Sequence, residues 1–239
     1  MKLKRYYIDK IDGENVVLEG DEFHHLANVM RTREGENVEL FCGDDYNYVA
    51  TVAKLNKKNA ELKIISKTKN IANPVQKIDL FQALAKGDKL SLIMQKITEI
   101  GASNMVVFES KFCDVKSNTG KLDKLESVSV SACKQCGRSK LTNVQGVMSF
   151  KDVVASVKKY DHFIVFYENE ENLLLKDYLS AIKQNQNVAI VIGPEGGFSN
   201  EEIDALKSAG AKIVSLGKRI LRTETAAILG VSVVSQYLE

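Results

Sequence analysis

Hydrophobic and polar positions change their spacing along the chain, and the change separates two regions. Up to about residue 70, short runs alternate hydrophobic with polar residues, and turn signals rich in glycine, asparagine and aspartate separate them. A period of two is typical of β-strands. The spacing favours a small β-barrel with strands over residues 4–8, 15–18, 37–41, 46–54 and 60–65. One helix is predicted between them, over residues 21–31, with Phe23, Leu26, Ala27 and Met30 on one face.

From Ile78 onward, short β-branched runs alternate with longer runs of helical spacing. Such alternation is typical of a mostly parallel sheet covered by helices on both faces. Pro74, one of only two prolines, lies between the two regions. The sequence therefore predicts a β domain over residues 1–70, a linker over 71–77 and an α/β domain over 78–239. In the α/β domain, strands are expected at 78–81, 105–108, 143–148, 162–167 and 188–192. Helices are expected near 88–100, 122–136, 151–158 and 170–183.

The helix over residues 88–100 is the best defined, because five apolar residues recur at helical spacing and Gly101 follows as a stop. These apolar residues are Leu90, Ile93, Met94, Ile97 and Ile100. Charged residues fall on its other faces, and a solvated surface explains most of them: Lys86, Lys89, Lys96 and Glu99.

Two glycine-containing runs follow predicted strands near the end of the chain. IGPEGGFS begins at Ile192, and LGKRILRTETA begins at Leu216. In the first, glycines without a Cβ let the backbone approach a ligand closely, and Ser199 with Glu202 forms a capping box at a helix start. The unpaired N–H groups and the positive dipole end of that helix suit a small polar or anionic molecule.

Composition sets bounds on these predictions. The 239 residues are 44% hydrophobic and 27% charged, which is ordinary for a globular protein. No apolar run approaches the roughly 20 residues of a membrane helix, and the N-terminus has no apolar segment typical of a signal peptide. A cytoplasmic protein with four reduced cysteines and no membrane association is expected.

Net charge and short motifs exclude some classes of function but do not identify one. The net charge is only +2, but basic residues cluster at 54–69, 134–140 and 218–222, where they either follow a phosphate backbone or form solvated faces. The Cys133-x-x-Cys136 spacing has no second ligand pair, so no metal site is predicted. The glycine run lacks the P-loop ending and the dinucleotide-binding spacing, and no serine nucleophile elbow occurs. Structural roles are expected for His162 and for one of the adjacent His24 and His25.

The pairing of IGPEGGFS with LGKRILRTETA, one helix and one strand apart, resembles the signature of the RsmE family. These SPOUT-class methyltransferases act on uridine N3 in 16S ribosomal RNA. Residues 25–35, 86–101 and 132–138 also match the family, so the resemblance spans nearly the whole chain. The paired runs carry the specificity, because either one alone supports only an α/β domain with a ligand site.

The resemblance implies a PUA-like β-barrel that binds RNA, followed by an α/β domain with a deep trefoil knot. It also implies S-adenosylmethionine in a pocket made by three loops, at about 167–170, 193–198 and 216–221. The implied cofactor-binding residues are Tyr167, Glu168, Ile192, Gly193, Pro194, Gly196, Gly197, Leu216, Gly217, Ile220, Leu221 and Thr223.

The implied partner is 16S rRNA within an assembled small ribosomal subunit, at the family's target uridine in the decoding region. The residues expected to contact RNA are Arg5, His25, Arg31, Lys86, Lys134, Gln135, Arg138, Lys218 and Arg219. A homodimer is expected through the last helix, residues 226–238, which has more apolar residues than one core-facing stripe requires.

Methyl transfer to a ring nitrogen that carries a proton needs positioning, a cation beside the developing negative charge and a proton acceptor. Arg222 and Arg138 are the candidate cations, and Glu195 and Glu224 are the candidate acceptors. Hydrogen bonding to its own loop is the alternative role of Glu195. Helix capping is the alternative for Glu224, and Thr223 or Thr225 could serve as the cap instead.

Two positions depart from the family pattern. Lys134 stands where an acidic residue is common, and Thr142 stands where a proline is usual, which predicts a looser turn into the next strand. Two other functions stay open from the residues alone. One is a non-catalytic RNA- or ribosome-binding protein, and the other is an enzyme that binds a phosphorylated metabolite at the Ser199 helix.

Overall fold

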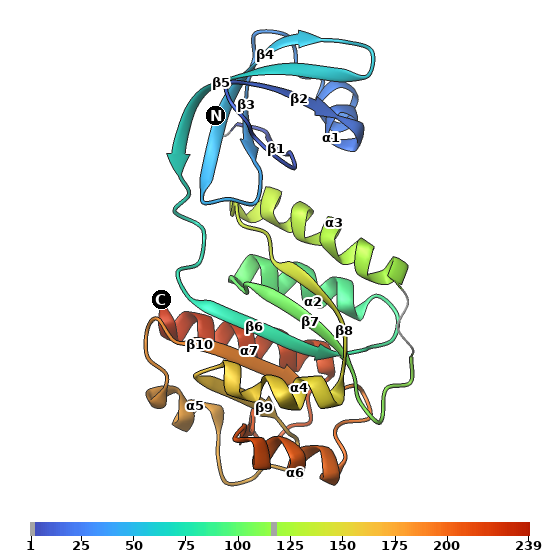
Figure 1. Ribbon diagram of the computed structural model, residues 1–239, viewed down its shortest axis with the longest axis vertical. Coiled ribbons are helices and arrows are strands. Elements are labelled where there is room, and N and C mark those ends of the chain that lie inside the picture. The colour runs from blue at the N-terminus through green and yellow to red at the C-terminus, as the bar shows by residue number, and fades with distance from the viewer. Residues whose placement is uncertain (1–2, 116–118) are drawn as a thin grey trace. The chain divides into compact units, whose positions relative to one another are not determined.

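The computed structural model describes residues 3–115 and 119–239, and the chain divides into two compact units (Figure 1). The first unit comprises the chain up to Asn73 together with residues 133–141, and the second comprises residues 74–132 and 142–239. The sequence-based division placed residues 133–141 in the second domain instead. They belong to the first because Asn73 Oδ1 accepts hydrogen bonds from the backbone N–H groups of Ser139 and Lys140, at 2.9 and 3.0 Å.

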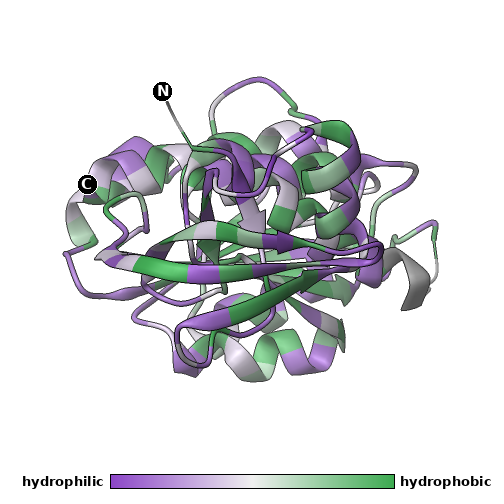
Figure 2. Cartoon of the chain, turned by 90° about the horizontal axis from the view of Figure 1, so that it is seen from above, coloured by the Kyte–Doolittle hydropathy of each residue, from purple (hydrophilic) through white to green (hydrophobic). Residues whose placement is uncertain are grey.

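The first unit is a curled five-stranded sheet in the order β1-β3-β4-β5-β2. Only the β1–β3 pair is parallel. Alternate side chains fill the inside of the curl, and Figure 2 shows hydrophobic and hydrophilic positions alternating along the strands. This confirms the β-strand prediction from the period of two. The strands are β1 (Arg5–Tyr7), β2 (Asn15–Glu19), β3 (Asn37–Phe41), β4 (Tyr46–Leu55) and β5 (Asn59–Lys69).

The helix predicted over residues 21–31 is shorter and less regular than expected. It consists of α1 (Gly20–His24) and a π-helical turn (His25–Val29), with Met30 as C-cap, and Arg31 after it has a φ of +49°. Leu26, inside the π turn, is fully buried. Met30, predicted on the same apolar face, follows the wider turn and is 36% exposed.

The second unit is built on a six-stranded parallel sheet in the order β11-β9-β10-β6-β7-β8. This confirms the predicted mostly parallel sheet. The strands are β6 (Lys77–Ala83), β7 (Asn104–Glu109), β8 (Asn143–Ser149), β9 (His162–Phe166), β10 (Asn187–Ile192) and β11 (Lys212–Val214).

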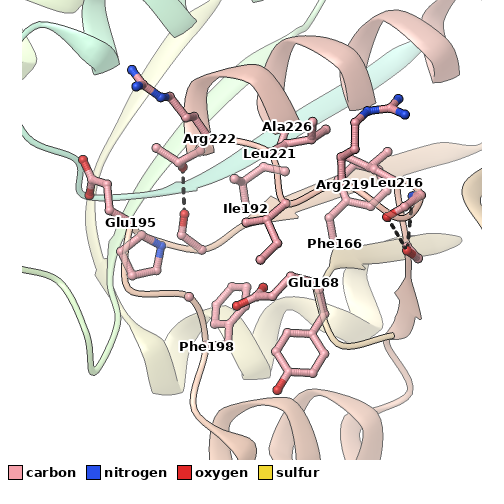
Figure 3. A pocket seen from close by; sticks show the side chains of 18 of the residues that line it. Phe166, Glu168, Ile192, Glu195, Phe198, Leu216, Arg219, Leu221, Arg222 and Ala226 are labelled. Atoms are coloured by element: carbon pink, nitrogen blue, oxygen red, sulfur yellow. Dashed lines mark hydrogen bonds between the residues drawn. The ribbon is translucent and has the colours of Figure 1, made fainter. Parts of the chain in front are cut away.

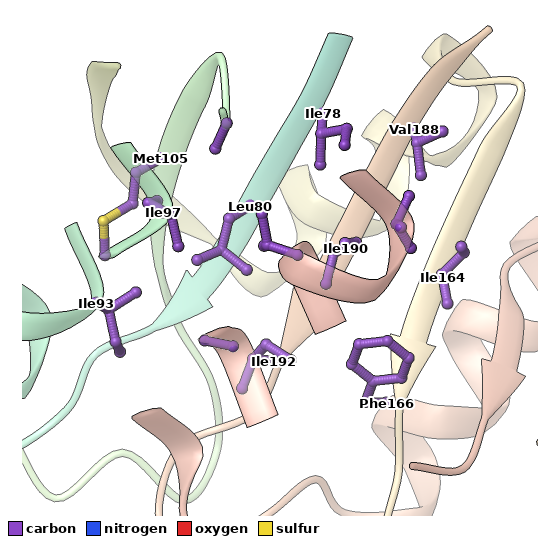
Figure 4. Close-up of a cluster of buried hydrophobic side chains, with 14 of the residues drawn as sticks. Ile78, Leu80, Ile93, Ile97, Met105, Ile164, Phe166, Val188, Ile190 and Ile192 are labelled. Atoms are coloured by element: carbon purple, nitrogen blue, oxygen red, sulfur yellow. The ribbon is translucent and has the colours of Figure 1, made fainter. Parts of the chain in front are cut away.

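Helices cover both faces of this sheet. On one face α2 (Lys89–Ile100), α3 (Thr119–Cys136), α5 (Leu175–Tyr178) and α7 (Thr223–Leu238) pack over a core that includes Ile78, Leu80, Ile164 and Ile190 (Figure 4). On the other face lie α4 (Phe150–Ser156), which continues as a 3₁₀ turn (Val157–Lys159), and α6 (Asn200–Ala209). Gly101 has a left-handed backbone and ends α2 as predicted.

Two local features differ from the sequence-based expectations. The helix expected over residues 170–183 is reduced to α5 and a 3₁₀ turn (Leu179–Ala181). The segment before α5 is not helical, because the Glu170 carboxylate accepts from the N–H groups of Asn172 and Leu173 and because Leu174 forms a β-bridge with Ser215. Thr142 does not loosen its turn. Its N–H donates to Ser129 Oγ at 2.9 Å and its hydroxyl donates to the Ala102 carbonyl at 2.8 Å, and a proline there would lack the first bond.

None of the helices in residues 3–115 and 119–239 combines the length and apolar character needed to cross a membrane. The four cysteines carry free thiols. The trefoil threading that the resemblance implies stays a prediction.

Candidate functional site

A pocket of about 390 Å³ lies at the carboxyl edge of the parallel sheet, where β9, β10 and β11 end. Ligands of open α/β sheets bind at this edge, because the connecting loops there are free to surround a ligand. Three loops and the start of α7 form the pocket (Figure 3). Its lining residues are Lys89, Phe166, Tyr167, Glu168, Ile192, Gly193, Pro194, Glu195, Gly197, Phe198, Ser215, Leu216, Gly217, Arg219, Ile220, Leu221, Arg222, Thr223 and Ala226.

Thr223 joins the glycine loop to the start of α7. Its hydroxyl donates to the Gly193 carbonyl at 2.8 Å and accepts a hydrogen bond from Gln82 Nε2 at 2.9 Å. Both side chains are buried. Thr223 therefore does not cap α7, whose N-cap is Arg222 with no side-chain cap. The loop that follows β10 is fixed to β6 and to α7 by this one hydroxyl.

Thr223→Val is expected to loosen the pocket, because valine keeps the shape but leaves the Gly193 carbonyl and the Gln82 amide without this partner. A lost hydrogen bond of a buried group costs about 1–3 kcal/mol. We expect the melting temperature to fall by several degrees, since about 2–4 °C accompanies each kcal/mol at this chain length. Thr223→Ser keeps the hydroxyl and serves as the control. Equal melting temperatures of the two variants in scanning calorimetry would contradict this role.

Two glycines of the first run have separate reasons for lacking a side chain. A Cβ on Gly197, whose φ is +70°, would lie 2.4 Å from Glu168 Oε1 in the pocket. A Cβ on Gly196 would lie 2.9 Å from the Cβ of Phe112. Gly196 was predicted to bind the cofactor, but it does not line the pocket and packs against Phe112 instead. The other eleven predicted cofactor-binding residues do line it.

A lysine that the sequence pattern assigned to a solvated face lies among the carboxylates at the pocket. Lys89 Nζ is 2.8 Å from Glu195 Oε1 and 3.8 Å from Glu224 Oε2. Glu195 also accepts from the Lys86 N–H at 3.0 Å. Burial alone would raise the pKa of Glu195, but the hydrogen bonds from Lys89 and Lys86 outweigh it, so the pKa lies below its ordinary value. Glu195 is therefore ionised at neutral pH.

Of the two candidate proton acceptors, only Glu195 lines the pocket. Its main partners are Lys89 and the Lys86 N–H, which lie outside its own loop. The Glu224 side chain, 14% exposed, lies behind Lys89 in the first turn of α7.

The two arginines of the second run extend from opposite ends of the loop in Figure 3, with Glu168 between Phe198 and the loop. Arg219 and Arg222 are both exposed. In the part of the chain that the structure describes, neither guanidinium has a carboxylate within 4 Å, so both charges are available to a ligand.

Arg138 and Arg5 are buried in the first unit, and their predicted contacts with substrate stay predictions. Arg138 is 3% exposed and does not line the pocket, and burial lowers the pKa of its guanidinium. Arg5 is 6% exposed, pairs with Glu39 and donates to the Cys133 and Arg138 carbonyls at 2.8 and 3.1 Å. Arg5 ties residues 133–138 to β1.

The other predicted RNA contacts differ in exposure. Lys134 pairs with Glu22 at 2.8 Å and lies 3.4 Å from His25 Nδ1, so its charge is largely neutralised. Burial and the neighbouring Lys134 ammonium lower the pKa of His25. The remaining predicted contacts are exposed, and their roles stay predictions: Arg31, Lys86, Gln135, Lys218 and Arg219.

Sequence reasoning missed four lining residues: Lys89, Phe166, Ser215 and Ala226. Phe166 is the last residue of β9, so the rule that ligands bind beyond strand ends could have found it. No signal in the pattern indicated Lys89, because its helical position is equally suited to solvent.

Comparison with known proteins agrees with this geometry. Residues 72–235 match the family model of the RNA methyltransferase domain, and residues 18–65 match that of the RNA methyltransferase PUA domain. The ribosomal RNA small subunit methyltransferase E of Rickettsia conorii is 30% identical over 241 residues, which cover 97% of this chain and 95% of that protein. The Bacillus subtilis protein of the same name is 28% identical over 250 residues, with 99% and 98% covered.

Solved structures are similar over the same length. Ribosomal RNA small subunit methyltransferase E from Neisseria gonorrhoeae, bound to S-adenosyl methionine, has a TM-score of 0.88 at 28% identity and covers 98% of both chains. A Legionella pneumophila protein in complex with the cofactor SAM has a TM-score of 0.89 at 31% identity, with 99% of this chain and 98% of that one covered. The chain therefore belongs to the RsmE family of ribosomal RNA small subunit methyltransferases.

Proposed function

We propose that this protein transfers a methyl group from S-adenosylmethionine to N3 of a uridine in 16S ribosomal RNA, in the cytoplasm. The observation that carries the proposal is the pocket at the carboxyl edge of the sheet. The two glycine-containing runs that identify the family form two of its walls, and Thr223 joins them. Two similar proteins were solved with S-adenosylmethionine bound.

The residues of the pocket fit this cofactor. Apolar walls from Phe166, Ile192, Leu216 and other side chains suit the adenine ring and the aliphatic chain, and the Glu168 carboxylate can accept hydrogen bonds from hydroxyl or ammonium groups. A volume of about 390 Å³ lies within the range of pockets for small molecules. When bound, the cofactor supplies an activated methyl group on its sulfonium.

The reaction forms a bond between uridine N3 and the methyl carbon, breaks the carbon–sulfur bond, and releases the N3 proton. Arg222, exposed at the pocket, is our candidate for the cation that stabilises negative charge on the uracil oxygens. Glu195 is the better placed of the two candidate proton acceptors, since it lines the pocket and is ionised. Lys89 fixes its orientation through the 2.8 Å ion pair.

We also propose that the protein is a homodimer through α7. Val231, Val234 and Leu238 of this helix are buried in the core, but Leu229 and Tyr237 are 38% and 47% exposed. Leu229→Asp is expected to shift the protein from dimer to monomer in analytical ultracentrifugation, because it places a charge in an apolar contact. Lys207→Ala, an exposed position on α6 instead of α7, should leave the dimer intact. A wild-type protein that sediments as a monomer would exclude this proposal.

Calorimetry with S-adenosylhomocysteine tests the proposed cofactor. Saturable binding with one site per chain is the expected result. If none is measurable at high protein concentration, the glycine loops have another role. Stabilisation by a phosphorylated metabolite, when S-adenosylhomocysteine gives none, would then identify a different enzyme. RNA binding without either ligand would indicate a non-catalytic RNA-binding protein.

A further inference from the structure

Phe112 is a large apolar side chain that the pocket does not use. It is 43% exposed, and it follows β7 at the same edge of the sheet as the glycine loop. Its main-chain and Cβ atoms pack against Gly196, where any side chain would come within 2.9 Å of the Phe112 Cβ. Gly196, a residue of the family-specific run, is therefore small in order to accommodate Phe112.

The turn that presents Phe112 is held on several sides. Cys113 N–H donates to the Ser110 carbonyl at 3.1 Å, and the Ser110 N–H donates to Cys113 Sγ at 3.3 Å. The Cys113 thiol in turn donates to the Leu84 carbonyl at 3.6 Å. These bonds fix the residues on both sides of Phe112, so the ring is exposed on a rigid turn.

The Glu202 carboxylate locks this turn to the glycine loop. One of its oxygens accepts from the Lys111 N–H at 2.9 Å, and the other accepts from the Ser199 N–H at 2.9 Å in the capping box of α6. Glu202 is 7% exposed, so the interaction is shielded from water. The position of Phe112 is thereby coupled to the wall of the pocket.

One lysine lies near the exposed ring, and a second pairs with a carboxylate two residues along the chain. Lys111 Nζ lies 5.6 Å from the ring centroid, and Lys86, which precedes α2, pairs with Asp114 at 2.7 Å. The carboxylates near Phe112, Asp114 and Glu201, are each paired with one of these lysines. All four side chains are more than half exposed, and exposed pairs are weak, so RNA phosphates can replace the carboxylates.

A rigid, exposed aromatic ring flanked by lysines is the arrangement with which proteins bind unpaired bases. We propose that Phe112 is the stacking platform for an unpaired base of the RNA substrate beside the cofactor pocket. Phe112 packs on Gly196, whose chain neighbours Glu195 and Gly197 line the pocket, so in this proposal the stacked base is a neighbour of the methylated uridine. This inference rests on the proposed function, since it takes RNA as the substrate.

The test compares Phe112→Ala, Phe112→Leu and Phe112→Tyr in the full-length protein. Fluorescence anisotropy with a labelled single-stranded oligouridine reports RNA binding, and calorimetry reports S-adenosylhomocysteine binding. Alanine is expected to weaken RNA binding roughly tenfold or more, since stacking on an aromatic ring is worth about that per base. Leucine, which keeps the apolar packing on Gly196, should lose most of the affinity too, and tyrosine should keep it. The affinity for S-adenosylhomocysteine should stay within about twofold in all three.

Several results would overturn the platform. These are equal RNA affinity of the alanine and wild-type proteins, no binding of oligouridine by the wild type, or full affinity in the leucine variant. A parallel loss of S-adenosylhomocysteine affinity would mean that Phe112 only supports the glycine loop. If a Phe112 variant lost self-association in ultracentrifugation, Phe112 would be a contact with another protein subunit and not with RNA. Absent S-adenosylhomocysteine binding by the wild type would instead contradict the proposed function.

Discussion

Replacing Arg222 by alanine is expected to lower turnover roughly 100- to 1,000-fold, the range seen when one group that stabilises transition-state charge is removed. The reason is its position: the guanidinium is exposed at the pocket and, among the described residues, has no carboxylate within 4 Å to neutralise it. Affinity for S-adenosylhomocysteine, measured by calorimetry, should change by less than about threefold, because the negative charge that Arg222 is proposed to stabilise develops on the uracil and not on the cofactor.

Two variants provide the controls for this experiment. Arg222→Lys keeps the charge and should recover part of the turnover, although a lysine lacks the planar fork of donors. Arg219→Ala removes the other exposed arginine of the same loop and should mainly raise the KM for RNA. If Arg222→Ala lowered turnover and cofactor affinity equally, the side chain would be supporting the loop rather than acting on the substrate.

Gly230→Ala is expected to be the most destabilising single methyl addition on α7. A Cβ at this position would lie 2.1 Å from the Cε2 atom of Phe166, the buried residue that ends β9 and lines the pocket. Alanine gains about 1 kcal/mol in helix propensity. Overpacking in a core costs typically 1–3 kcal/mol, and a contact this short forces either the ring or the helix to move. We expect the clash to prevail and Phe166 to shift into the pocket.

The expected result is a melting temperature lower by up to about 8 °C, given about 2–4 °C per kcal/mol for a chain of this size. Affinity for S-adenosylhomocysteine should fall with it. Gly146→Ala is the matched control, because no atom lies within 4 Å of its Cβ position and its φ is not positive. That variant should melt within about 2 °C of the wild type, as surface substitutions do. A more stable Gly230→Ala protein would show that helix propensity outweighs the contact.

Much of the fold follows from local periodicity. The β-branched runs of the second unit became parallel strands because hydrophobic side chains on both faces require cover by helices. The capping box of Ser199 and Glu202 formed as its spacing predicts. The π turn at His25–Val29 did not follow from the pattern, because its residues suit an ordinary α-helix equally well.

Much of the pocket was predictable too, because strand ends and glycine runs mark the loops that form it. Side chains brought in by tertiary packing were not. Helical spacing predicts that Lys89 is a solvated residue of α2. In the structure, the pairing of β6 with β10 places α2 beside Glu195. Arg5 and Arg138 read as RNA contacts, but the return of residues 133–141 to the first unit buries both. Spacing along one segment contains no information about such distant partners.

Nucleoside mass spectrometry of RNA tests the central claim most directly. Small-subunit RNA from cells that lack this protein would be incubated with the purified chain and S-adenosylmethionine, then digested to nucleosides. We predict one new methylated nucleoside that co-elutes with N3-methyluridine, and little of it with Arg222→Ala. Methylation of a ribose, of another base atom, or of no nucleoside at all in free RNA and in assembled subunits would contradict it.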